Sequence, residues 1–327
     1  MKRNTSVSNF IIIALCVLFF TLLVLVANAP ESAAALAAFF IGPWNGAWFS
    51  GNTLDAVSLL LVAALGAVAA FQGGCFNLGG EGQIYIGGLA AALVSLLLPP
   101  VAGMSLWVAA VAAITAGGAM GFIAGFLKKA VGANEIITSF LLSGALVPVA
   151  DYLLAGPLRD PSGNLLATKA VPRLLRILPP SNLSISFYVS LLLVVAGHFF
   201  VNNTIFGYRL KIAGSTPAFA HYAGIDASRC WMPSMALSGA LSGLAGFFAV
   251  AGTYGRCHVG FSGGLGWNAI AVALIAHNRP LLLIPVALVY AALEQGSQSV
   301  MLTIGLRFET SAFIQAAALF FAAIQSR

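Results

Sequence analysis

The feature that most constrains this chain is a succession of apolar runs, each about as long as a membrane-spanning helix. The alternating segments of about ten residues that build outer-membrane barrels are not the pattern here. Of the 327 residues, 60% are hydrophobic and only 7% are charged, whereas soluble proteins are about 25% charged. The sequence therefore predicts an all-α fold, a polytopic transmembrane helical bundle that forms a single membrane domain over residues 1–327.

Hydropathy predicts about ten spans, and the eighth is short and polar at its start, so a count of eight to ten fits the pattern. The expected spans are 10–28, 54–72, 84–98, 105–127, 135–154, 183–201, 231–251, 265–277, 280–300 and 309–325.

Loop charges predict the orientation of these spans. With the N-terminus inside, ten spans place nine of the fifteen Lys and Arg residues in the cytoplasm and six outside. Short cytoplasmic loops are enriched in Lys and Arg, whereas long loops translocate with less regard to charge. Four of the six exceptions fall in the long segment 156–182. We expect a bacterial inner-membrane protein with both termini in the cytoplasm, and we assign the net charge of +6 to orientation, not to nucleic-acid binding.

Segment 156–182 is expected to be an external loop. It holds five of the fourteen prolines, and its stretch "RLLRIL" (173–178) suggests a short helix lying at the membrane interface. The segment suits a plain connector and a docking surface for an external partner equally well.

Two glycine-rich stretches indicate an internal repeat. "FNLGGEGQ" from Phe76 and "FSGGLGWN" from Phe261 share a Gly-Gly-x-Gly core, and the two cores lie 184 residues apart. They precede helices of opposite expected direction, which favours two inverted five-helix halves, 1–155 and 183–327. Glycine-broken helix starts suit close helix packing, and they suit the lining of a solute path as well.

Polar residues near these glycines are the candidates for a solute path, because polar groups in hydrocarbon are costly unless they face a cavity or a partner. A structural role is also expected for one of them, since Asn134 precedes an apolar run and is placed to cap its helix, with Glu135 in the first turn. The expected span 280–300 contains three further polar residues, Glu294, Gln295 and Gln298, and the two glutamines share one helix face. The path candidates are Asn77, Glu81, Gln83, Asn134, Thr138, Trp267 and Asn268.

No catalytic or metal-binding arrangement is recognisable in the sequence. The four histidines (198, 221, 258 and 277) have no HExxH spacing, and no Gly-x-Ser-x-Gly motif is present. The four cysteines (16, 75, 230 and 257) lie far apart, without metal spacing, and are expected to pack as small apolar residues. We expect no catalytic residue, no metal and no cofactor, and therefore a protein that is not an enzyme.

A short basic segment interrupts the apolar runs within 203–229, which is expected to be cytoplasmic. In "FGYRLKIAGSTPAFAHYAGI" (206–225), Thr216 is placed to cap a helix, Pro217 to occupy its first turn, and Gly224 to end it. Such a helix either rests on anionic headgroups or docks on a partner. The candidate docking residues are Arg209, Lys211, Pro217, Phe219, His221 and Tyr222.

Several of these motifs resemble one family. "FNLGGEGQIYIGG", "GANEIITSFLLS", the 206–225 segment and "GFSGGLGWNAIAVALIA" are similar to permease subunits of ABC importers for nucleosides, simple sugars and branched-chain amino acids. The resemblance covers roughly residues 55–325 and lies with the nucleoside-type subfamily, which also includes riboflavin permeases. It implies separate ATPase subunits, a second permease subunit (identical or paralogous) and an external solute-binding protein.

The sequence is therefore interpreted as a permease subunit that moves a nucleoside-like solute through the bilayer by alternating access, with riboflavin or a simple sugar as alternative solutes. The 206–225 segment would then be a coupling helix for the ATPase. An ion-coupled secondary transporter is the main rival, for which Glu81 is the only ion-site carboxylate that the sequence suggests. A membrane scaffold or receptor is the second rival.

Overall fold

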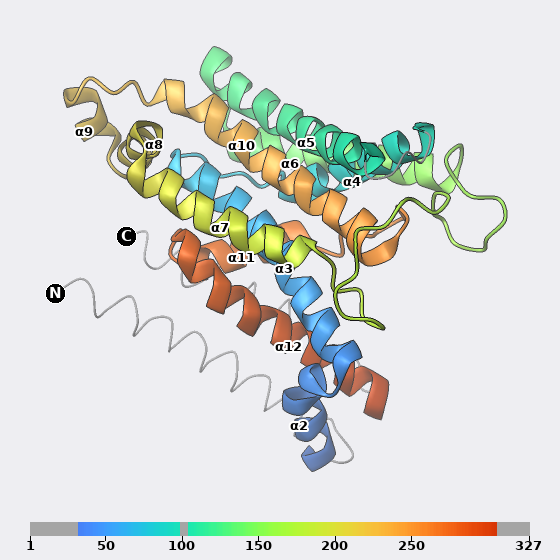
Figure 1. Ribbon diagram of the computed structural model, residues 1–327. Coiled ribbons are helices and arrows are strands. Elements are labelled where there is room, and N and C mark those ends of the chain that lie inside the picture. The colour runs from blue at the N-terminus through green and yellow to red at the C-terminus, as the bar shows by residue number, and fades with distance from the viewer. Residues whose placement is uncertain (1–31, 99–103, 306–327) are drawn as a thin grey trace.

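The computed structural model describes residues 32–98 and 104–305, and every regular element in these residues is a helix (Figure 1). The all-α prediction is confirmed for this part of the chain. The short elements are the 3-10 helices η1 (Gly42–Trp44) and η3 (Pro280–Leu282) and the π-helix η2 (Phe248–Tyr254). The α-helices are α2 (Ser32–Ile41), α3 (Ala47–Gln72), α4 (Gly80–Leu97), α5 (Met104–Val131), α6 (Glu135–Ala155), α7 (Ser186–Asn203), α8 (Ile205–Ser215), α9 (Pro217–Tyr222), α10 (Ser228–Phe247), α11 (Leu265–Ile275) and α12 (Leu283–Ile304).

Seven helical stretches of the described chain are long and apolar enough to cross a membrane. They are α3, α4, α5, α6, α7, α10 continued by η2, and η3 continued by α12. Each coincides with a predicted span, and the largest difference is at α3, which begins at Ala47 instead of residue 54. The expected spans 10–28 and 309–325 lie outside the described residues.

The expected span 265–277 is not a full span. Helix α11 has 11 residues, which at 1.5 Å per residue gives a length of about 16 Å. The hydrocarbon core of a bilayer is about 30 Å thick. The polar start noticed in the sequence is therefore a true boundary, because the chain before Leu265 is not helical.

Helix α2 was not predicted from the sequence. This ten-residue helix packs against α12, where Phe39 and Val300 are both buried in one small apolar cluster. Its contact with α12 is close, since a Cβ atom placed on Gly296 would lie 2.5 Å from the carbonyl oxygen of Phe39. A helix this short gives no signal in a window of membrane-span length.

Helix α10 lies at the centre of the bundle and packs on α3, α4 and α5 (Figure 1). Its approach to α5 depends on glycines. A Cβ atom on Gly117 would lie 2.3 Å from the carbonyl oxygen of Gly239, and one on Gly239 would lie 2.2 Å from that of Gly117. Small residues at such positions allow two membrane helices to approach backbone to backbone.

The expected helix at 173–178 does not form. Leu174 donates its backbone N–H to the carbonyl oxygen of Ala251 at 2.9 Å, and Arg176 forms an isolated bridge with Ser184. The segment is therefore held extended against the end of η2 by backbone hydrogen bonds, and prolines at 172, 179 and 180 flank it. This arrangement carries Asn182 to the N-terminal part of α3, where its backbone N–H donates to the Asn52 Oδ1 at 3.0 Å.

Candidate functional site

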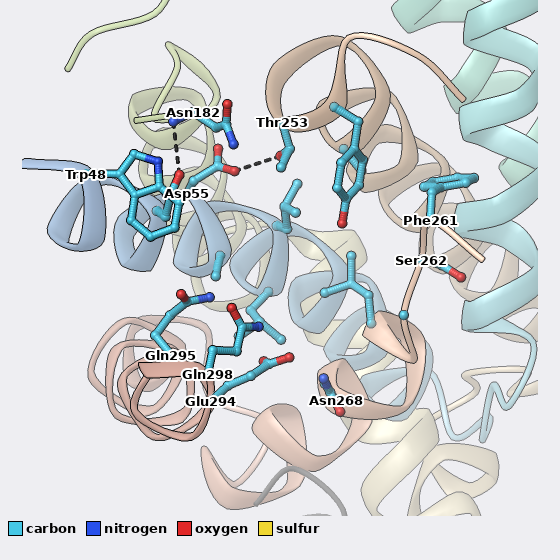
Figure 2. A pocket seen from close by; sticks show the side chains of 18 residues that line it. Trp48, Asp55, Asn182, Thr253, Phe261, Ser262, Asn268, Glu294, Gln295 and Gln298 are labelled. Atoms are coloured by element: carbon cyan, nitrogen blue, oxygen red, sulfur yellow. Dashed lines mark hydrogen bonds between the residues drawn. The ribbon is translucent and has the colours of Figure 1, made fainter. Parts of the chain in front are cut away.

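A polar cavity lies between α3, η2 and α12, and it is closed on one side by the connection that precedes α11 (Figure 2). Its volume is about 490 Å³. Pockets that hold small organic ligands typically measure about 300–1,000 Å³. The lining residues are Trp48, Asn52, Asp55, Ala56, Leu59, Leu60, Asn182, Ala249, Thr253, Tyr254, Phe261, Ser262, Gly263, Leu265, Asn268, Glu294, Gln295 and Gln298.

Helix α3 supplies one wall because its cavity residues recur at helical spacing. Trp48, Asn52, Asp55 and Leu59 are separated by four, three and four positions, which places them on one face of the helix. Trp48, at the N-terminal end of α3, remains 45% exposed. The wall thus runs from an aromatic ring through two polar groups to an apolar floor.

Asp55 is the most deeply buried acidic side chain of this wall, with 3% of its surface exposed. Its Oδ2 accepts a hydrogen bond from the Thr253 hydroxyl at 2.7 Å. Its Oδ1 has no hydrogen-bond partner within the described part of the chain. Figure 2 shows the carboxylate between Asn182 and Thr253 at the edge of the cavity.

Asp55 was not among the predicted site residues, although it lies within the predicted span 54–72. An ionisable residue inside an apolar run is by itself a sign of a functional site. Glu81 is therefore not the only carboxylate that the membrane region offers, contrary to the prediction.

Helix α12 forms the opposite wall. Glu294, Gln295 and Gln298 face the cavity from this helix (Figure 2). The prediction that the two glutamines share a face is confirmed, since both line the same cavity. Their amide groups can donate and accept hydrogen bonds, which suits a neutral polar solute.

Asn268 is the one predicted path residue that lines this cavity. It is 3% exposed, and its Oδ1 accepts a hydrogen bond from the Tyr290 hydroxyl at 2.7 Å. Its neighbour Trp267 points elsewhere and packs edge to face on Phe140 of α6, with the ring centroids 6.3 Å apart.

Asn77 and Gln83 are brought together at the start of α4, where both are almost fully buried. The Asn77 amide nitrogen donates to the Gln83 Oε1 and to the Ser238 hydroxyl, each at 2.9 Å. The Asn77 Oδ1 accepts from the Gly79 N–H at 2.9 Å. These contacts stabilise the turn into α4, and contact of either residue with a solute stays a prediction.

Glu81 joins the start of α4 to the start of α11. Its Oε1 accepts from the Ser262 hydroxyl at 2.5 Å and from the Gly264 N–H at 3.0 Å, and its Oε2 accepts from the Gly266 N–H at 2.7 Å. A carboxylate is stabilised by the N–H groups at a helix N-terminus. Glu81 therefore holds the connection whose residues Ser262 and Gly263 line the cavity, and its place on the solute path itself stays a prediction.

The two glycine motifs meet at this point. A Cβ atom on Gly266 would lie 2.3 Å from the backbone nitrogen of Glu81. Only glycine allows this approach, so the packing role considered for these glycines is present at Gly266.

The expected cap at Asn134 is confirmed. Its Oδ1 accepts from the Ile136 N–H at 2.9 Å at the start of α6. Glu135, in the first turn, forms an ion pair with Lys128 at 2.7 Å. The hydroxyl of Thr138 donates to the Asn134 carbonyl oxygen at 3.1 Å. These contacts are local, and neither Asn134 nor Thr138 lines the cavity.

The basic segment contains two helices where one was expected. Arg209 and Lys211 lie in α8, which is capped by the Thr204 hydroxyl at 3.0 Å from the Gly207 N–H. Helix α9 begins with Pro217 in its first turn, as predicted, and Gly224 follows it with a φ of 72°. Thr216 occupies the N-cap position but makes no side-chain cap bond, so that detail was wrong.

Three of the predicted docking residues on α9 are exposed. Phe219 is 55% exposed, Tyr222 is 89% exposed, and His221 is exposed beside them. Arg209 and Lys211 on α8 are exposed too.

The end of α8 is in backbone contact with the loop between α3 and α4. A Cβ atom on Gly214 would lie 2.3 Å from the Gln72 carbonyl oxygen and 2.7 Å from the Gly74 nitrogen. Gln72 in turn donates from its side-chain Nε2 to the Asn278 carbonyl oxygen at 2.9 Å, beyond the end of α11.

No cysteine is among the residues that line the described cavity. Cys75, Cys230 and Cys257 are free and buried in apolar clusters, which confirms their expected packing role, while Cys16 lies outside the described residues. Within residues 32–98 and 104–305, no group of three or more His, Cys, Asp or Glu side chains is placed to hold a metal ion.

Comparison with known proteins decides the family. Residues 50–323 match the family model described as branched-chain amino acid transport system / permease component. The chain belongs to this family. It is therefore a multi-pass membrane permease of the ABC transporter class and not an ion-coupled transporter, and ATP hydrolysis lies in partner subunits.

The relatives of this permease serve different solutes. It is 38% identical to the "Probable riboflavin import permease protein RfuC" of Treponema pallidum, over 90% of this chain and 79% of the relative. It is 28% identical to the guanosine ABC transporter permease protein NupP of Bacillus subtilis, over 92% and 88% of the two chains. It is 30% identical to the glucose ABC transporter permease protein TsgB13 of Haloferax volcanii, over 80% and 72%.

Proposed function

We propose that this permease imports riboflavin or a closely similar flat heterocycle, and that the cavity between α3, η2 and α12 is part of its path. The observation that carries the proposal is the composition of this cavity, in which aromatic rings and neutral amides accompany two carboxylates, the buried Asp55 and the half-buried Glu294. The 38% identity to a protein named as a riboflavin permease supports riboflavin as the first solute to test.

The chemistry of the walls suits a flat heterocycle. Trp48 and Tyr254, which are 45% and 36% exposed, offer ring faces on which a planar solute can stack. Asn52, Asn182, Gln295 and Gln298 offer donors and acceptors for ring carbonyl and N–H groups and for a hydroxylated side chain. Nucleosides share these features, and guanosine is the second candidate because of the guanosine permease among the relatives.

We further propose about ten crossings of the membrane in two inverted halves, with both termini in the cytoplasm; α11 and the non-helical connection before it together make one of these crossings. Support comes from Figure 1, where α8 and α9 lie at one end of the bundle and segment 156–182 lies at the other. The meeting of two glycine-broken helix starts at Glu81 and Gly266 is also typical of inverted-repeat transporters.

The proposed complex contains a second permease subunit, ATPase subunits and an external solute-binding protein. Helix α9 is the proposed coupling helix, because Phe219 and Tyr222 present exposed aromatic rings beside basic residues at one end of the bundle. Helices shorter than about 12–15 residues are marginal alone in water, so a partner surface is expected to hold this six-residue helix. Segment 156–182, at the other end, is the proposed contact for the solute-binding protein.

Uptake of labelled riboflavin tests this function. Cells that neither make nor otherwise import riboflavin should take it up when they express the permease with its ATPase and binding protein. Unlabelled riboflavin should compete strongly, guanosine weakly and glucose not at all. Uptake of guanosine without uptake of riboflavin would move the assignment to the second candidate, and uptake of glucose alone would contradict both.

A further inference from the structure

We infer that Asp55 and Asn182 together recognise the edge of a ring lactam or imide, with the Asp55 Oδ1 accepting a hydrogen bond from the ring N–H of the solute. This inference rests on the proposed function and names the feature of the solute that the cavity selects.

The first observation is the unused acceptor. Asp55 is 3% exposed, its Oδ2 is held by the Thr253 hydroxyl at 2.7 Å, and its Oδ1 has no partner among the described residues. A buried polar group without a hydrogen bond loses its interaction with water and gains nothing in return. A donor on the solute would remove this loss, which makes the Oδ1 a strong point of discrimination.

The second observation is the donor beside it. The Oδ1 of Asn182 accepts a hydrogen bond from the Arg176 guanidinium at 3.1 Å. The amide nitrogen is a separate group with two N–H donors, so the bond from Arg176 to the oxygen leaves this nitrogen able to donate. Asn182 lines the cavity, and Figure 2 shows it next to Asp55.

An acceptor next to a donor is complementary to an N–H next to a carbonyl group. A lactam or imide edge presents this pair on one flat ring, whereas a sugar presents hydroxyls that each donate and accept. The Thr253 hydroxyl fixes the carboxylate, and the Asn182 backbone N–H is bonded to Asn52 at 3.0 Å. The Asp55 carboxylate and the backbone at Asn182 are thus held in place before a solute binds.

The experiment measures discrimination between two solutes, not uptake alone. The full importer in proteoliposomes is given riboflavin and 3-methylriboflavin, in which the ring N–H is replaced by N–CH₃. The wild type is expected to favour riboflavin by about 100-fold or more in kcat/KM, because sites built around a hydrogen bond reject analogues that lack it. Asp55→Leu removes both carboxylate oxygens and should reduce riboflavin uptake and bring this preference down to about tenfold or less.

Two further variants make the result decisive. Asp55→Glu keeps the acceptor and should keep most of the preference even if its rate falls. Asp151→Asn removes a carboxylate on α6 that is bonded to the Tyr85 hydroxyl and does not line the cavity, so both uptake preference and kcat/KM should stay near wild type.

The outcomes separate this inference from the proposed function. An unchanged preference in Asp55→Leu, with the variant assembled with its ATPase, would overturn the role of Asp55. If the wild type transports no riboflavin, the proposed solute is wrong, and guanosine is compared with 1-methylguanosine in the same variants. Equal uptake of that pair by the wild type would overturn the inference for nucleosides as well.

Discussion

The Oε2 of Glu81 accepts a hydrogen bond from the backbone N–H of Gly266 at 2.7 Å, across 185 positions of the chain. The same carboxylate also binds the Gly264 N–H and the Ser262 hydroxyl. One side chain therefore joins the starts of α4 and α11, and it does so directly behind the wall of the cavity.

Replacement of Glu81 should weaken the fold as well as transport. Glu81→Ala leaves two backbone N–H groups and one hydroxyl without their acceptor, at a cost of about 2 kcal/mol or more. We expect a lower melting temperature of the purified permease and reduced riboflavin uptake. Glu294→Gln, on the cavity wall, should reduce uptake with little change in melting temperature. A Glu81→Ala protein with normal stability and normal uptake would contradict the structural role assigned to this carboxylate.

The glycine contact between α5 and α10 should tolerate no side chain. Gly239→Ala places a methyl group 2.2 Å from the Gly117 carbonyl oxygen, and overpacking of this kind costs about 3 kcal/mol or more. The yield of monodisperse protein in detergent should fall sharply. Gly144→Ala is the matched control, because a Cβ atom on that α6 glycine meets no atom of the described chain within 4 Å. Equal yields for the two variants would show that α5 and α10 have room for a methyl group at Gly239.

The coupling role of α9 predicts a loss of the ATPase without a loss of the permease fold. Phe219→Ala with Tyr222→Ala removes the two aromatic rings that are 55% and 89% exposed. Aromatic contacts dominate many protein interfaces, so ATPase binding should weaken about tenfold or more in copurification. Tyr152→Ala removes a ring that is 72% exposed on α6 and should leave binding unchanged. Normal copurification and transport in the double variant would assign the partner surface elsewhere.

The orientation is tested by labelling of introduced cysteines in intact cells. Ser162→Cys, in the exposed part of segment 156–182, should react with an impermeant thiol reagent. Ser215→Cys, at the end of α8, should react only after permeabilisation, as should Ser6→Cys and Ser326→Cys. The background is expected to be low because Cys75, Cys230 and Cys257 are buried. Labelling of Ser215→Cys from outside would reverse the proposed topology.

The helices were predictable because their causes are local. An apolar run of about twenty residues can satisfy its backbone in lipid only as a helix, and the seven spans follow that rule. The cap at Asn134 was predictable for the same reason, since it involves Asn134 and the N–H two positions later. The stretch 173–178 was wrongly predicted because its backbone bonds to distant residues, among them Ala251.

The cavity was not predictable in the same way. Asp55 and Thr253 are 198 positions apart, and Asn52 and Asn182 are 130 apart. Asp55 and Thr253 meet because α3 packs against η2, and Asn52 and Asn182 meet because of the path of segment 156–182. A hydropathy pattern encodes neither of these. The one available signal was Asp55 itself, a charged residue inside an apolar run.

The contact of Gly214 with Gln72 and Gly74 has a mechanical consequence. Backbone lies on backbone there, so a displacement of α8 cannot be absorbed by the rotation of a side chain. A movement of α8 caused by the ATPase would be transmitted to the start of α4 through the loop after Gln72. It would be transmitted to the C-terminal end of α11 through the hydrogen bond from Gln72 to Asn278. Because α4 and α11 are themselves joined at Glu81, the two routes meet at the connection whose residues Ser262 and Gly263 line the cavity.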